Sequence, residues 1–96
     1  MTSEEFLAIV ENEDPPGFLP EILLALWFDR KGDWDKAHEL AQAIPTSDGS
    51  WVHAYLHRRE GDLWNARYWY NRAGRAESKA DLESEWLEIV DTLVDR

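Results

Sequence analysis

Two histidines, His53 and His57, stand four residues apart in a stretch without helix breakers. On an α-helix this spacing turns both imidazoles to the same face, where they could bind zinc or another divalent ion. Such a site needs a third ligand. Glu60 stays close to the same face and His38 lies in the segment before, but no established metal-binding motif is present. His53 and His57 are therefore weak candidate metal ligands, and we expect no cofactor.

The histidine pair has two other interpretations. Buried imidazoles can belong to the core when they are hydrogen-bonded to carboxylates or tyrosine hydroxyls. Alternatively, His53 and His57 could line a small-molecule or anion pocket together with Arg67 and Asn71, which follow in the next predicted helix. A metal-assisted hydrolase is the least favoured function, because the sequence supplies no nucleophile and no recognisable acid–base pair.

Residues 51–75 form a cationic, aromatic segment inside an acidic chain. They contain five arginines, two acidic residues and six aromatic residues. Within this segment Trp51, Tyr55 and Arg58 recur at helical spacing on one stripe, and Arg59 follows. Arginine binds carboxylates through a planar fork, and aromatic rings add rigid contact area. We therefore expect the stripe to bind an acidic or carboxylate-bearing partner, with Trp51 at least partly exposed.

The last predicted helix competes for the same arginines. Its carboxylates and its tryptophan could dock against the stripe and satisfy the arginines within the chain. The residues concerned are Asp81, Glu83, Glu85, Trp86, Glu88 and Asp91. The sequence leaves both interpretations of the stripe open, the external partner and the internal one.

The charge balance argues against several classes of function. The chain has 20 acidic and 10 basic residues and a net charge of −10, so its surface repels the phosphate backbone of nucleic acids. It has no cysteine, which removes thiol catalysis, disulfides and zinc fingers. The longest apolar run, from Ile22 to Phe28, is too short to span a membrane, and the first residues lack a basic region. We therefore expect a cytoplasmic protein that binds neither nucleic acid nor membranes.

Prolines, glycines and capping residues divide the 96 residues into six predicted helices. Thr2 and Glu5 have the spacing of a capping box at the start of the first helix, and Pro20 suits the first turn of the second. The later helices are expected to begin at Asp33, near Ser50, at Asp62 and at Ser78 with Asp81, and to end near Pro45, Gly61, Gly74 and the C-terminus. No stretch alternates with period two, so the predicted fold class is all-α in a single domain.

Part of this pattern repeats after 29 residues, the interval from Gly32 to Gly61. Small residues recur where two helices approach closely, which is typical of a repeated helical hairpin. The matching pairs are Gly32 and Gly61, Asp33 and Asp62, Ala25 and Ala54, and Ala37 and Ala66. The same offset pairs the two histidines with apolar Leu24 and Phe28, so we expect the imidazoles to face inward.

The repeated Gly-Asp turn with a small residue a few positions later resembles the tetratricopeptide repeat. The resemblance covers residues 19–75 as two hairpins of a right-handed superhelix, with 1–18 and 76–96 as capping segments. It implies a groove lined by the first helix of each hairpin, which for the second hairpin contains Trp51 and Arg58, and it implies protein binding. The stretch Trp51–Asp62 is also similar to a group of small helical proteins with no assigned activity, which adds no functional expectation.

The favoured function is therefore a protein–protein interaction module that binds a protein or peptide partner in an aromatic, arginine-lined groove. A small-molecule or anion-binding protein is the alternative, and a metal-assisted hydrolase is the less favoured one. A homodimer is possible, because two hairpins leave an edge that another chain could cover.

Overall fold

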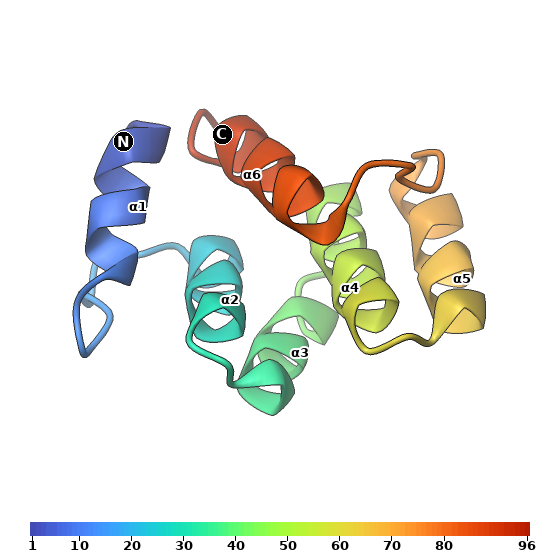
Figure 1. The fold of residues 1–96 in the computed structure, drawn as a ribbon, viewed down its shortest axis with the longest axis horizontal. Coiled ribbons are helices and arrows are strands. Elements are labelled where there is room, and N and C mark those ends of the chain that lie inside the picture. Colours follow the sequence, from blue (N-terminus) through green and yellow to red (C-terminus); the bar gives the residue numbers. More distant parts are fainter.

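A computed structural model describes all 96 residues, and it consists of six α-helices without any β-strand. The all-α prediction is confirmed. In chain order the helices are α1 (Ser3–Val10), α2 (Glu21–Arg30), α3 (Trp34–Gln42), α4 (Ser47–Arg59), α5 (Leu63–Ala73) and α6 (Leu82–Leu93). Figure 1 shows α2 to α5 as consecutive antiparallel segments, with α1 at one end and α6 across the top.

Most helix starts follow from local capping. Thr2 and Glu5 form the capping box, and Asp33 and Asp62 accept a hydrogen bond from the amide three residues later. One predicted start is wrong, and one predicted cap includes a residue that does not contribute. Helix α4 begins at Ser47 rather than near Ser50, because the Thr46 hydroxyl caps it. Helix α6 is capped by Asp81 alone, and the Ser78 hydroxyl accepts from the amide of Ala80 instead.

The two Gly-Asp turns have the same backbone geometry. Gly32 and Gly61 both have φ of +88°, a conformation that L-residues with a Cβ disfavour. The amides of Asp33 and Asp62 each donate to the carbonyl five residues earlier, and both N···O distances are 2.9 Å. Each turn therefore reverses the chain in the same way, so that α3 packs on α2 and α5 packs on α4.

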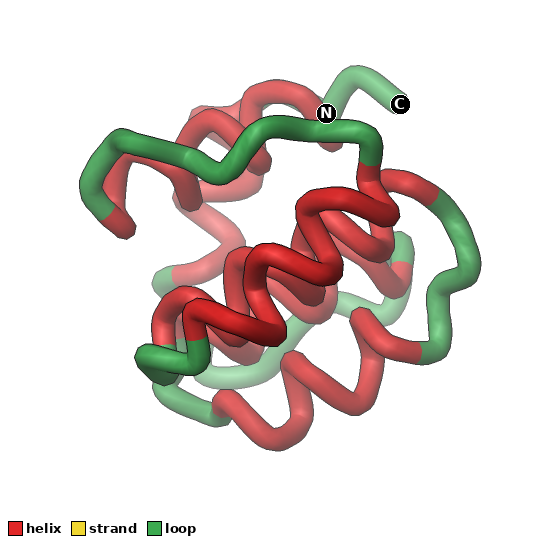
Figure 2. Tube along the Cα trace, turned by 90° about the vertical axis from the view of Figure 1, so that its right-hand side faces the viewer, coloured by secondary structure: helices red, strands yellow, loops and turns green.

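Helix α6 closes the molecule. It lies across α2 and α4 and also contacts α1, far from it in sequence (Figure 1). Its buried face carries Trp86, Ile89, Val90 and Leu93, which join a single hydrophobic core drawn from all six helices. The two chain ends lie close together (Figure 2), and the Ser3 hydroxyl donates to the carboxylate of Asp91.

None of the six helices combines the length and the apolar character that a membrane crossing would need.

Candidate functional site

The predicted stripe on α4 faces α6. Trp51 is only 2% exposed and Tyr55 is fully buried, so the expectation that Trp51 is partly exposed is wrong. The Arg75 guanidinium lies over the Trp51 ring, 3.5 Å from its centroid. The indole Nε1 donates to Glu85 of α6 over 3.3 Å. A neighbouring loop and the last helix thus cover the ring from two sides.

Glu85 is the centre of the contact between α4, α5 and α6. Its side chain is 1% exposed, and it accepts from Arg58 Nη1 at 2.7 Å and from the Tyr70 hydroxyl at 2.7 and 2.6 Å. Arg58 also donates to the carbonyl of Ala80. Burial, together with the hydrogen bond to Glu85, raises the pKa of Tyr70 well above its usual value. The last helix therefore docks against the stripe, as the internal interpretation predicted.

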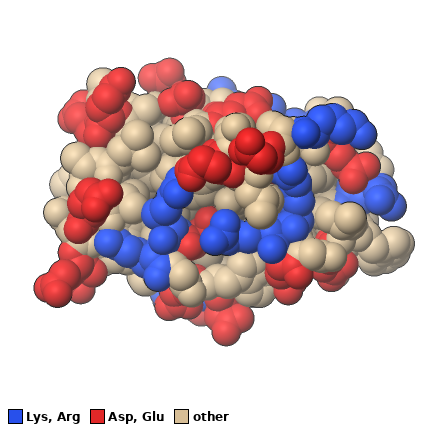
Figure 3. Space-filling model, viewed as in Figure 1, with Lys and Arg blue, Asp and Glu red and all other residues tan.

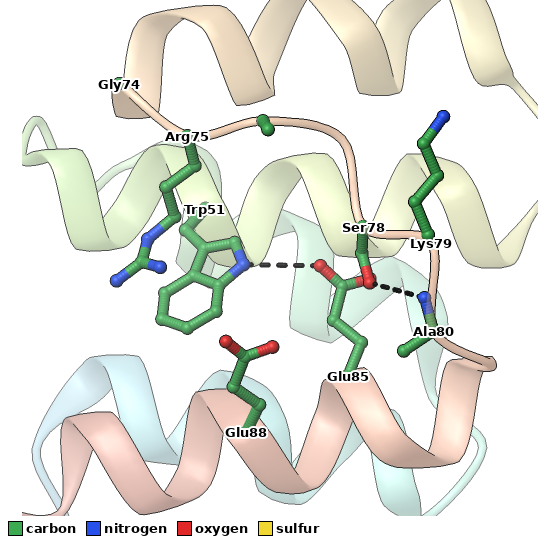
Figure 4. Close-up of a pocket in the computed structure, with 9 residues that line it drawn as sticks. Trp51, Gly74, Arg75, Ser78, Lys79, Ala80, Glu85 and Glu88 are labelled. Atoms are coloured by element: carbon green, nitrogen blue, oxygen red, sulfur yellow. Dashed lines mark hydrogen bonds between the residues drawn. The ribbon is translucent and has the colours of Figure 1, made fainter.

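Two hollows remain beside this contact. The larger, of about 520 Å³, opens next to Trp51 and is bordered by charges of both signs (Figure 4). Arg75 and Lys79 are its cations, and Glu85 and Glu88 are its carboxylates. Figure 4 shows Glu85 reaching toward the Trp51 indole, with Glu88 below the ring. Glu85 already accepts hydrogen bonds from Trp51, Arg58 and Tyr70, so its carboxylate is not available to a ligand in this hollow.

The second hollow, of about 340 Å³, lies between α2, α4 and α6. Asp29 is 3% exposed, and its Oδ1 lies 3.3 Å from Arg59 Nε but makes no hydrogen bond. Trp86 Nε1, also buried, has no acceptor. Burial raises the pKa of Asp29, although Arg59 opposes that shift, and burial raises the pKa of Tyr55 to about 12. Asp29, held by its ion pair with Arg59, and Trp86, whose Nε1 lacks an acceptor, thus border the same hollow.

The two predicted histidines come together with a third, His38 of α3. His53 and His57 are buried as expected, and His38 is half-buried. His53 Nε2 and His38 Nε2 are 2.9 Å apart, and one ring nitrogen from each of the three imidazoles lies within 4.8 Å of the others. His57 Nδ1 lies 2.7 Å from Glu60 Oε2.

The imidazoles lie in an aromatic enclosure. Trp34 stacks on His38 with ring centroids 4.8 Å apart, and Trp69 stacks on His53 at 4.0 Å. Burial, followed by the proximity of the other two imidazoles, lowers the pKa of His53 to about 4, so this ring is neutral at physiological pH. Burial likewise lowers the pKa of His38. Neutral imidazole is the form that binds metal ions.

Arg67 and Asn71 do not join the histidines. They are exposed on the outer face of α5, where they line a shallow hollow of about 230 Å³ with Trp64 and Tyr68. No hollow in the structure is lined by His53 or His57. Trp64 is 74% exposed and was not among the predicted site residues, although its i, i+4 spacing to Tyr68 places the two rings side by side on a helix.

Positive charge is concentrated on part of the surface. Lys and Arg gather over the middle and right of the face in Figure 3, whereas Asp and Glu dominate its left side. The right side is where α5 lies in the matching view of Figure 1.

The chain has no match among protein-family models, among curated proteins or among solved structures.

Proposed function

We propose that the protein is a protein-interaction module that binds an acidic peptide segment through the outer face of α5. The observation that carries this proposal is the exposure of Trp64, one helical turn before the exposed Tyr68. Exposed aromatic side chains that are adjacent on a helix are typical of binding surfaces, since burying them on a partner releases a large apolar area.

The charges around these rings favour an acidic partner. Arg67 and Arg72 flank the aromatic pair, and the Arg72 guanidinium is 5.9 Å from the Tyr68 ring centroid. Arg67 has one internal partner, Glu77, across an exposed contact of 3.2 Å that a stronger ligand can displace. In a chain of net charge −10 this face is a local cationic area. By contrast, Arg58 of the predicted groove is already paired with Glu85.

The repeated hairpins support a tetratricopeptide-like architecture as part of the same proposal. The support consists of the equal turn geometry at Gly32 and Gly61 and the fully buried alanines at Ala25 and Ala54. Modules of this kind present helical surfaces to peptides. The cytoplasmic location stays a prediction from the sequence.

The test is a titration with a helical peptide that carries leucines on one face and glutamates on the other. Tryptophan fluorescence and calorimetry report binding. We expect Trp64→Ala and Arg67→Glu each to weaken binding at least about tenfold, as hot-spot residues do. Phe18→Ala is the matched control, because Phe18 is 69% exposed but lies in the turn before α2. An affinity for the peptide that is unchanged in Trp64→Ala would overturn the proposal. A dimer in sedimentation experiments that Trp64→Ala dissociates and Phe18→Ala does not would also overturn it, since this face would then bind a second copy of the chain.

The hollow between α2, α4 and α6 favours a second candidate function, the binding of a small zwitterion. Asp29 and Arg59 border this hollow with opposite charges, so a ligand with both an ammonium and a carboxylate group would find a partner for each of its charges there. A thermal-unfolding screen with free amino acids tests this candidate. We expect a rise in the midpoint that Asp29→Asn removes, and no rise with any amino acid would exclude it.

A further inference from the structure

We propose that His38, His53 and His57 form a binding site for a divalent transition-metal ion of the zinc type. The three imidazoles converge from two helices, with one nitrogen of each within 4.8 Å of the others. They are also the only three histidines of the chain, and all of them lie in this one cluster. The site lies between α3 and α4, so it does not depend on the outer face of α5.

The separation between His38 and His53 is close to the one that a tetrahedral ion requires. Zinc–nitrogen bonds of about 2.0–2.1 Å at tetrahedral angles place two nitrogens about 3.3 Å apart. The Nε2 atoms of His38 and His53 are 2.9 Å apart, so an ion between them needs a small outward movement. His38 is partly exposed, so its ring can make that movement without disturbing the core.

Glu60 supplies the outer contact that metal-binding imidazoles usually have. Its Oε2 lies 2.7 Å from His57 Nδ1, which fixes the proton on Nδ1 and leaves the lone pair of Nε2 for a metal. Asp62 is also near His57, but its carboxylate already accepts from the amide and side chain of Asn65 at 3.2 and 2.6 Å. Glu60 is therefore the carboxylate free to orient the ligand.

The surrounding tryptophans hold the rings in place. Trp34 stacks on His38, and its own Nε1 donates to the carbonyl of Leu56 at 2.8 Å, which anchors it to α4. Trp69 stacks on His53. Three imidazoles suit zinc, copper or nickel rather than magnesium or calcium, which prefer oxygen ligands. Three protein ligands also leave a fourth position for water or an exogenous ligand.

The test is titration of chelator-treated protein with Zn²⁺ by calorimetry and with Co²⁺ by visible absorption. We expect one ion per chain, the absorption spectrum of tetrahedral Co²⁺, and a rise in the thermal midpoint with Zn²⁺ but not with Mg²⁺. His38→Gln should abolish the tetrahedral spectrum. Glu60→Gln should weaken Zn²⁺ binding about 10- to 100-fold, because it removes the orienting charge but not the ligands. Glu88→Gln, an exposed carboxylate on α6, is the matched control and should leave the affinity unchanged.

His53→Gln tests the buried ligand, and circular dichroism decides whether that variant is folded. If it unfolds, His38→Gln alone decides the question, since the half-buried position tolerates the change. A folded wild-type protein that takes up neither Zn²⁺ nor Co²⁺ would overturn the proposal. Equal Zn²⁺ affinity in His38→Gln and wild type would do the same.

Discussion

The hydroxyl of Tyr70 donates to the carboxylate of Glu85, with its oxygen 2.7 and 2.6 Å from the two carboxylate oxygens. The two residues belong to α5 and α6, and Arg58 of α4 completes the cluster from the third side. One buried carboxylate thus links three helices. Such a group stabilises a fold only while all of its partners are present, because a buried charge without partners is costly.

We therefore expect Glu85→Ala to lower the free energy of unfolding by about 3 kcal/mol, the low end for a broken buried pair. The low end applies because the Arg58 side chain keeps 19% of its surface exposed and can regain water. Tyr70→Phe should cost about 1.5–3 kcal/mol, the range for a hydrogen bond to a charged group. Urea unfolding followed by tryptophan fluorescence measures both. Glu88→Ala on the exposed side of α6 is the control. If Glu85→Ala and Tyr70→Phe lower the free energy of unfolding no more than Glu88→Ala does, the role of Glu85 is refuted.

The turn glycines give a second prediction. Gly32 and Gly61 have φ of +88°, and an added Cβ would meet no atom within 4 Å at either site. The cost of alanine is therefore in the backbone alone, about 1–2 kcal/mol at each position. Gly17 has open space around it as well but no left-handed φ, so Gly17→Ala should change stability by less than about 0.5 kcal/mol. Thermal unfolding of the three variants compares them, and equal midpoints would contradict the argument.

These turns show which part of the fold the sequence can predict. A glycine in the left-handed region followed by a capping aspartate is a local arrangement, so residues next to one another specify it. The same is true of the capping box at Thr2 and of the helical spacing that put His53 and His57 on one face. These features were predicted from the chain alone.

The errors concern contacts between distant residues. Trp51 was expected to be exposed because it begins the stripe on α4, but Glu85, 34 positions later, binds its indole. The sequence places His38 only in the segment before His53, because the distance between the two imidazoles depends on how α3 packs against α4. Asp29 of α2 and Trp86 of α6 border the same hollow only after α6 has docked. Sequence patterns on one helix carry no information on such packing.

Gly49 provides a third prediction, at the start of α4. A Cβ at this buried position would meet the carbonyl oxygen of Ile44 and lie 2.8 Å from the Ile44 Cβ. The backbone would have to shift, so we expect Gly49→Ala to cost about 1–3 kcal/mol, as overpacking does. Ser47→Ala, at an exposed position in the same turn, should have little effect. Denaturant unfolding of both variants tests the contact, and a Gly49→Ala protein as stable as Ser47→Ala would show that the turn adapts freely.

The last prediction concerns acid sensitivity of the metal-free protein. Burial and the neighbouring His38 and His57 lower the pKa of His53 to about 4, whereas in the unfolded chain it returns to its usual 6.5. Between these values the unfolded state binds the proton more readily, so stability is complete above about pH 6.5 and falls as the pH drops toward 4. Carboxylates behave differently. The hydrogen bond to Arg30 lowers the pKa of Glu83, so Glu83 keeps its contribution to the free energy of unfolding until the pH is lower still. Asp29, whose pKa burial raises, acts in the opposite direction. Unfolding in urea with a chelator present, at about pH 7 and about pH 5.5, is therefore compared between the wild type and His53→Gln to separate the contribution of His53.

We expect a smaller free energy of unfolding at the lower pH, and a flatter dependence in His53→Gln, which cannot titrate. Glu88→Gln is again the control, because its exposed carboxylate should leave the wild-type slope in place. Equal stability of the wild-type protein at the two pH values would mean that the folded state accepts the proton on His53 without cost. That result would require His53 to be more open to water than its stacking against Trp69 indicates.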